Sequence, residues 1–183
     1  MKKFLLTFIL FLIFISSNSY AQTEIPIASI TPTQSPSKGP VQYELPYPGV
    51  LPGALLYNLK AVRDRIIEFL MSDPSKKSNF YLLQADKRLS ASIMLFDRGK
   101  NVLAETTLSK SQNYLEKAID KAEKVSNLKG RFGEANDRIK LSSAKQIEEL
   151  EKLIKENKGE TNQKLKGDLK RAKELQKRAE KLR

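Results

Sequence analysis

The side chains in this sequence that could do chemistry are carboxylates, lysines, tyrosines, serines and threonines. The chain has no cysteine and no histidine, which excludes thiol nucleophiles, Cys-ligated metal sites and a Ser-His-Asp triad. Paired catalytic carboxylates would have to converge in a cleft. The acids here are instead scattered among lysines, and Glu148 and Glu149 stand at helical salt-bridge spacing from Lys145 and Lys152. We therefore expect a protein that is not an enzyme and that binds no cofactor and no metal.

Positive charge is the stronger chemical signal. The chain has 33 Lys and Arg residues against 21 Asp and Glu residues, a formal net charge of +12. The C-terminal stretch is dense in cations, which form a candidate anion-binding set: Lys164, Lys166, Lys170, Arg171, Lys173, Lys177, Arg178, Lys181 and Arg183. Such a stretch can attract anionic envelope polymers or a membrane surface, or it can simply keep a helix soluble. It lacks aromatic side chains that stack on bases, so we expect no sequence-specific nucleic-acid binding.

The N-terminus is typical of an export signal. A basic start is followed by an apolar run over residues 4–15, and Ser19 and Ala21 are small residues at positions suited to a cleavage site. We predict a signal peptide over residues 1–21, cleaved between Ala21 and Gln22, and hence a secreted or extracytoplasmic protein with no permanent transmembrane span. The run is short against the ~20 residues that cross a bilayer. An uncleaved anchor is the alternative.

Residues 22–45 are predicted to be a disordered, proline-rich linker. Seven of the eight prolines fall between Gln22 and Pro52, and proline is excluded from helix interiors and central strands. Serine, threonine and glutamine fill the gaps, which is typical of an extended tether. The stretch from Tyr43 to Leu51 is more apolar, and we expect it to pack against the first helix.

The pattern after residue 53 predicts two helices that form an antiparallel hairpin. The apolar face of the first helix recurs at spacings of three and four: Leu55, Leu59, Val62, Ile66 and Phe69/Leu70. Asp73 and Pro74 are suited to the N-cap and first position of the second helix, and Gly99 is suited to its end. The second helix buries one face, made of Leu82, Ala85, Leu89, Ile93 and Phe96.

A third apolar stripe keeps one helical phase from Leu108 to Ile154. Gly130 and Gly133 each cost about 1 kcal/mol in a helix relative to alanine, which favours a break, whereas the unbroken phase favours one long, kinked helix. We favour the long helix and keep the break as the alternative. A final amphipathic helix, capped by Thr161, is expected to fold back on the preceding one or to pair with a second chain.

These patterns together predict an all-α fold. Its helical domain, an antiparallel hairpin within a three-helix core, covers residues 46–125. A basic, coiled-coil-like helical arm follows over residues 126–183, and the proline-rich tail precedes both. No stretch alternates with the period of two that a half-buried strand requires.

Several short motifs stand in a recognisable order: Leu51-Pro52-Gly53, Tyr57, Lys60, Asp73-Pro74, Arg88-Leu89 and Gly99. In this order they resemble an uncharacterised, DUF-type helical domain family of exported and membrane-anchored bacterial proteins, over roughly residues 46–124. The resemblance implies an exported helical module with no catalytic residues to transfer. We interpret the motif residues as structural: turn formers, helix caps and side chains with buried stems.

The sequence leaves two functional hypotheses. The first is a non-enzymatic, exported interaction or scaffold module of the bacterial cell envelope, which binds an envelope protein or itself through helix faces. The alternative is an electrostatic binder of anionic envelope polymers or lipid head groups through the basic C-terminal arm. Binding by charge weakens steeply with salt, whereas a seam of leucine and isoleucine survives it.

Overall fold

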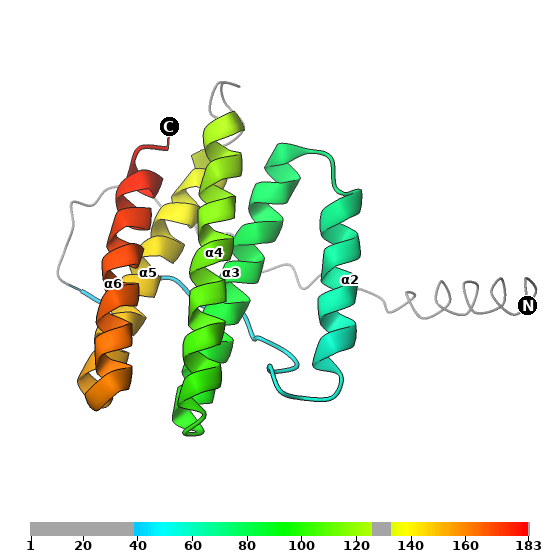
Figure 1. Cartoon of the computed structure of the whole chain (residues 1–183). Coiled ribbons are helices and arrows are strands. Elements are labelled where there is room, and N and C mark those ends of the chain that lie inside the picture. The colour runs from blue at the N-terminus through cyan, green and yellow to red at the C-terminus, as the bar shows by residue number, and fades with distance from the viewer. Residues whose placement is uncertain (1–38, 126–132, 183) are drawn as a thin grey trace, which may run out of the picture. The chain divides into compact units, whose positions relative to one another are not determined.

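The structure, a computed structural model, describes residues 39–125 and 133–182. In these residues the chain forms helices and no strand: α2 (Tyr57–Leu70), α3 (Pro74–Asp97), α4 (Asn101–Val125), α5 (Gly133–Glu156) and α6 (Gly159–Glu180). Figure 1 shows α3 to α6 packed as a bundle, with α2 beside α3 at its edge. The predicted all-α fold is confirmed. The predicted signal peptide and most of the predicted linker lie outside the described residues.

α3 begins and ends where its capping residues predict. The Asp73 carboxylate accepts a hydrogen bond from the Ser75 backbone N–H at 2.8 Å, and Pro74 is the first residue of α3. Gly99 has a φ of +68°, in the left-handed region that favours glycine at a helix end. The chain then enters α4, and leucines from both helices meet in the core: Leu82, Leu89, Leu108 and Leu115.

The favoured continuous helix from Leu108 to Ile154 is wrong, and the break is confirmed. α4 ends at Val125, and α5 begins at Gly133 and runs back along α4 (Figure 1). Gly130 lies outside the described residues. The apolar spacing continues from α4 into α5, although the chain changes direction, because both helices turn their apolar sides to the same core. Periodicity alone therefore could not distinguish a bent helix from two antiparallel ones.

α6 folds back on α5, as one of the two sequence alternatives predicted, and completes the bundle (Figure 1). It begins at Gly159, not after a Thr161 cap. The Gly159 φ of +65° turns the chain directly into the helix. The side of α6 that faces the bundle is small and apolar: Leu165, Ala172, Leu175 and Ala179 are all buried.

The core contains two apolar clusters with polar side chains between them. The first cluster includes Leu115 and Ile139, and the second includes Leu108 and Leu150. Between them, in sequence order on α3, α4 and α5, stands a buried polar layer: Asp86, Ser111, Gln112, Ser142, Ser143 and Gln146. Gln146 Nε2 donates to Ser111 Oγ at 3.1 Å. Because each buried polar group needs a hydrogen-bond partner, such a layer fixes the register of the packed helices.

Residues 39–45, the last part of the predicted linker, lie against the bundle as an N-terminal strap. The Val41 backbone N–H donates to Glu148 Oε2 of α5 at 2.6 Å, and the Tyr43 hydroxyl donates to the Asp86 carboxylate of α3. Leu45 packs against the second apolar cluster. The prediction that Tyr43 and Leu45 pack against the first helix is therefore wrong. The strap lies along α3 and α5 because its hydrogen-bond donors pair there with the buried carboxylate of Asp86 and the half-buried carboxylate of Glu148.

Candidate interaction surface

α2 turns its polar side toward the bundle. Its Asp64 is only 6% exposed, and Glu68 accepts a hydrogen bond from the Tyr81 hydroxyl of α3 at 2.8 Å. Near the start of the helix, Lys60 Nζ donates to the Pro48 carbonyl at 2.7 Å. Burial and the bond to Glu68 raise the pKa of Tyr81 to about 12, so its hydroxyl remains a donor at neutral pH. Polar contacts therefore attach α2 to its surroundings.

The opposite side of α2, with the turn before it, carries an apolar stripe that faces solvent. The exposed fraction of its members runs from 54% at Ile66 to 96% at Leu55. We define the apolar stripe as Leu55, Leu59, Val62, Ile66, Phe69 and Leu70. The sequence predicted this apolar face, and its membership is confirmed. It nevertheless points away from the bundle, whereas the apolar face of a surface helix usually faces the core.

The apolar stripe is the leading candidate for an interaction surface because it gathers six exposed apolar side chains. Apolar patches above about 300–600 Å² are rare on monomers and mark sites for proteins, membranes or ligands. Full burial of one Leu, Ile, Val or Phe side chain stabilises by about 1.5–3 kcal/mol. Since the members of the stripe are already partly covered, burying half of their exposed area would contribute roughly 3–6 kcal/mol. A single exposed leucine needs no explanation, but a complete helix face does.

A small pocket lies where the segment before α2 meets α2 and α3, and motif residues from the sequence line it. Pro52, Tyr57, Lys60 and Arg88 contribute to its wall. Its free volume is about 10 Å³, roughly that of one water molecule. Burial lowers the pKa of Lys60 below its ordinary value. The space is too small for a substrate, so the pocket is a packing junction.

The other motif residues occupy turns, caps and core positions. Gly53 has a φ of +90°, and a Cβ there would approach Leu103 Cδ2 at 3.2 Å, so both conformation and space favour glycine. The Arg88 guanidinium lies 4.1 Å from the centre of the Tyr114 ring. Leu89 is fully buried and Leu51 half-buried. These positions, with Asp73, Pro74 and Gly99, shape the fold.

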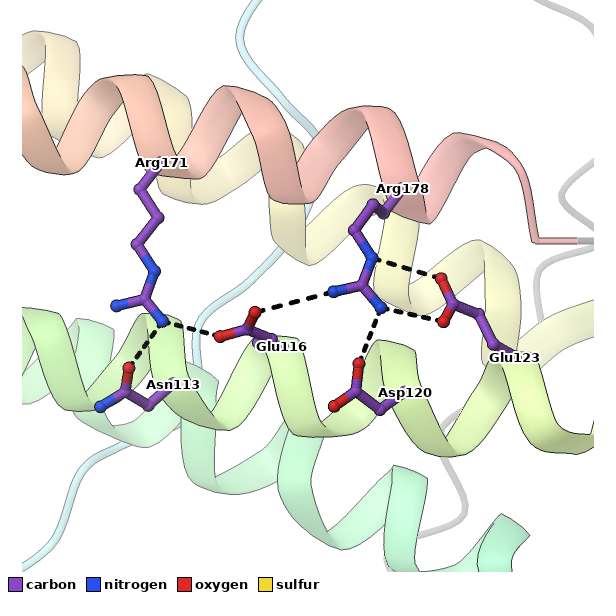
Figure 2. Close-up of polar contacts among 6 residues, drawn as sticks. All are labelled: Asn113, Glu116, Asp120, Glu123, Arg171 and Arg178. Atoms are coloured by element: carbon purple, nitrogen blue, oxygen red, sulfur yellow. Dashed lines mark hydrogen bonds and ion pairs between the residues drawn. The ribbon is translucent and has the colours of Figure 1, made fainter.

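Several of the candidate anion-binding residues are engaged within the bundle. Figure 2 shows Arg171 and Arg178 of α6 reaching acidic side chains of α4. Arg178 Nη2 lies 2.7 Å from Asp120 and 2.9 Å from Glu123, and Arg171 Nη2 lies 2.8 Å from Glu116. Lys164 contacts Glu105 and Glu160, and Lys173 contacts Glu151. Later residues of α6 contact later residues of α4, so these ion pairs hold α6 parallel to α4.

The other described cations of this set, Lys166, Lys170, Lys177 and Lys181, are exposed on α6 or directly after it. Within the described ranges, no ion pair engages Lys166, Lys170, Lys177 or Lys181, and Arg183 lies outside those ranges. Lys166, Lys170, Lys173 and Lys177 line an open depression with Leu169 and Glu174. Part of the predicted basic surface is therefore accessible, and part is used to hold α6.

Sequence reasoning missed which way the first helix faces. One signal was present: Lys60, Asp64 and Glu68 follow at intervals of four and so share one helix side. A charged side of this kind can face a neighbouring helix only where that helix supplies polar partners, as Tyr81 does here. Nothing local in the sequence identified those partners.

Among the helices that the structure covers, none is both long and apolar enough to cross a membrane. In the same residues, no group of three or more acidic side chains is placed to hold a metal ion.

The described residues thus define an all-α bundle protein with an additional edge helix whose apolar stripe is exposed. The sequence matches a family described as a domain of unknown function (DUF5667) over residues 49–181. Because the match covers most of the chain, the protein belongs to the DUF5667 family. This confirms the resemblance to an uncharacterised helical domain and extends it beyond residue 124, through α5 and α6. No curated protein and no solved structure matches the chain.

Proposed function

We propose that this protein is a non-enzymatic, exported interaction module of the bacterial cell envelope, which binds its partner through the apolar stripe of α2. The observation that supports this proposal is the exposure of that complete helix face, with Phe69 at 86% and Leu70 at 72%. The bundle supplies a rigid support, and the polar contacts of α2 hold the stripe outward. An interaction module needs a shaped apolar surface and no reactive group, and the stripe is such a surface.

The electrostatic alternative has one observation in its favour, the open depression lined by Lys166, Lys170, Lys173 and Lys177. Its support is weaker because Arg171, Arg178 and Lys164 pair with acids of the bundle. Salt separates the two proposals. Binding through α6 would be screened within a Debye length of ~10 Å at 0.1 M salt, whereas binding through the apolar stripe would persist.

The first prediction concerns retention of the purified protein on isolated cell envelopes. We expect retention in high salt, and we expect Leu59→Ser with Ile66→Ser to reduce it at least about tenfold, because both side chains would be covered in the complex. Sedimentation of envelopes with bound protein measures it. Val102→Ser with Leu141→Ser is the matched control, since these apolar side chains are also exposed but lie on α4 and α5.

The control variant should bind like the unmodified protein. Equal loss in both double variants would mean that exposed apolar area in general, not the stripe, causes retention. Retention that disappears in high salt for every variant would contradict the proposal and favour the basic side of α6.

A further inference from the structure

We propose that the apolar stripe lies on the surface of an anionic phospholipid membrane, with α2 in the plane of the interface. This inference rests on the proposed function, because it names the partner of the same surface. An interfacial helix combines one apolar face with cations on its flanks. It lies on the bilayer without crossing it.

The charges next to the apolar stripe have one sign. Arg63 neighbours Leu59 and Ile66 at helical spacing, while Arg65 neighbours Val62 and Phe69 on the other flank. Both arginines are exposed. Arg63 also contacts Asp64 at 2.9 Å and keeps 65% of its side chain exposed. Long basic side chains on the flanks of such a helix can reach phosphate groups while the apolar face is immersed.

The acids of α2 lie on its other side. Asp64 is buried toward the bundle, and Glu68 receives the Tyr81 hydroxyl and lies 3.5 Å from Lys117 Nζ. The outward half of α2 therefore presents apolar groups and cations without a carboxylate. This arrangement complements an anionic surface, which attracts each nearby basic residue.

A second copy of the chain is the less suitable occupant. If two stripes paired, Arg63 and Arg65 of one copy would approach the same residues of the other, and α2 has no outward carboxylate to compensate them. Like charges across an interface oppose association. A lipid surface has no such conflict.

The dimensions and position of α2 also suit a membrane surface. α2 has 14 residues, about 21 Å at the helical rise of 1.5 Å per residue, which is shorter than the ~20 residues that cross a bilayer. Figure 1 shows α2 at the edge of the described helices, separated from α4, α5 and α6 by α3. A flat surface can therefore approach the stripe without meeting the bundle.

The test uses a fluorescent reporter, since the chain has no tryptophan. Ile66→Trp places the only indole within the stripe, and Leu141→Trp places it on the exposed side of α5 as the matched control. We expect a blue shift of the Ile66→Trp emission with vesicles of phosphatidylglycerol and phosphatidylcholine in equal parts, and none with phosphatidylcholine alone. The control should not shift with either, even if residues 4–15 were to insert into the vesicles.

Vesicle sedimentation supplies the second measurement. Leu59→Ser with Phe69→Ser should weaken binding at least about tenfold. Arg65→Gln should weaken it about fivefold at low salt, the effect of one basic residue at an anionic surface. Lys110→Gln, an exposed cation of α4, is the matched control and should change binding less than about twofold.

Three results would overturn the membrane proposal. If Ile66→Trp shows no shift while stripe substitutions still abolish salt-resistant envelope retention, the partner is a protein and the proposed function stands. If the stripe substitutions also leave envelope retention unchanged, both proposals fail. If the protein forms a dimer without lipid, and Leu59→Ser with Phe69→Ser abolishes the dimer, the stripe belongs to a second copy.

Discussion

Leu115→Ala is expected to lower the free energy of unfolding by about 2–5 kcal/mol, whereas Leu59→Ala is expected to change it by less than about 0.5 kcal/mol. Leu115 is fully buried in the cluster that also contains Leu82, Ile119 and Ile139. Its truncation removes apolar contacts and leaves a cavity that the surrounding helices only partly close. Leu59 is 68% exposed, so its truncation removes little native packing.

Urea unfolding followed by circular dichroism measures both changes on the same chain. Leucine is replaced by alanine within a helix in each variant, so helix propensity contributes equally and cancels in the comparison. Similar losses in the two variants would show that the apolar stripe is packed in the folded protein. The interpretation of α2 as an outward-facing helix would then be wrong.

Tyr43→Phe is expected to lower the free energy of unfolding at neutral pH by about 1.5–3 kcal/mol, the contribution of a hydrogen bond to a charged group. Its hydroxyl donates to Asp86, which is 1% exposed and also accepts from Ser142 Oγ at 2.5 Å. Without Tyr43 the buried carboxylate loses one of these two donors. The change would also show that the N-terminal strap contributes to the folded state.

The effect of Tyr43→Phe is expected to depend on pH. Burial raises the pKa of Asp86 above its ordinary value of 3.8, while the hydrogen bonds from Ser142 and Tyr43 oppose the rise. A raised folded-state pKa favours folding at low pH, and this stability is lost as the pH rises through that pKa. Removing the Tyr43 hydroxyl raises the pKa of Asp86 further. Tyr43→Phe therefore lowers the free energy of unfolding more at neutral pH than below pH 3.8.

Unfolding free energies from pH 3 to pH 7 test this dependence, and Asp86→Asn supplies the control. In the Asp86→Asn background the carboxylate no longer titrates, so Tyr43→Phe should have the same effect across this range. A pH-independent effect in the unmodified background would contradict the assigned role of Asp86. Other groups, such as Glu148 with its pKa lowered to about 2 by Lys145 and Lys152, are common to all variants.

Features with a local cause could be predicted from the sequence. Asp73 and Pro74 mark a helix start because an N-cap carboxylate accepts a hydrogen bond from a free backbone N–H of the first turn, and proline has no N–H that would need a partner. Gly99 marks a helix end because the left-handed conformation costs glycine little. The members of the apolar stripe follow from spacing alone, as do the ion pairs of Lys145 and Lys152 with Glu148 and Glu149.

Features that depend on distant partners could not be predicted. The spacing of Leu59 and Ile66 identifies a face but not its direction, which depends on what α3 offers to Asp64 and Glu68. The bond between Tyr43 and Asp86 joins residues 43 positions apart, and no periodic pattern encodes such a pair. Gln146 likewise stands at a core position, where the bond from its Nε2 to Ser111 Oγ satisfies the nitrogen of the buried amide but not its oxygen.

We expect the apolar stripe to be open in the free protein and covered on the cell envelope. The chain has no cysteine, so Leu59→Cys introduces a single thiol into the stripe, and Val102→Cys gives a matched exposed thiol on α4. We predict that both react rapidly with a maleimide in solution, and that isolated envelopes in high salt slow only the Leu59→Cys reaction. A slow Leu59→Cys reaction in the free protein would show that the stripe is not open, and equal rates with and without envelopes would show that the envelope does not cover it.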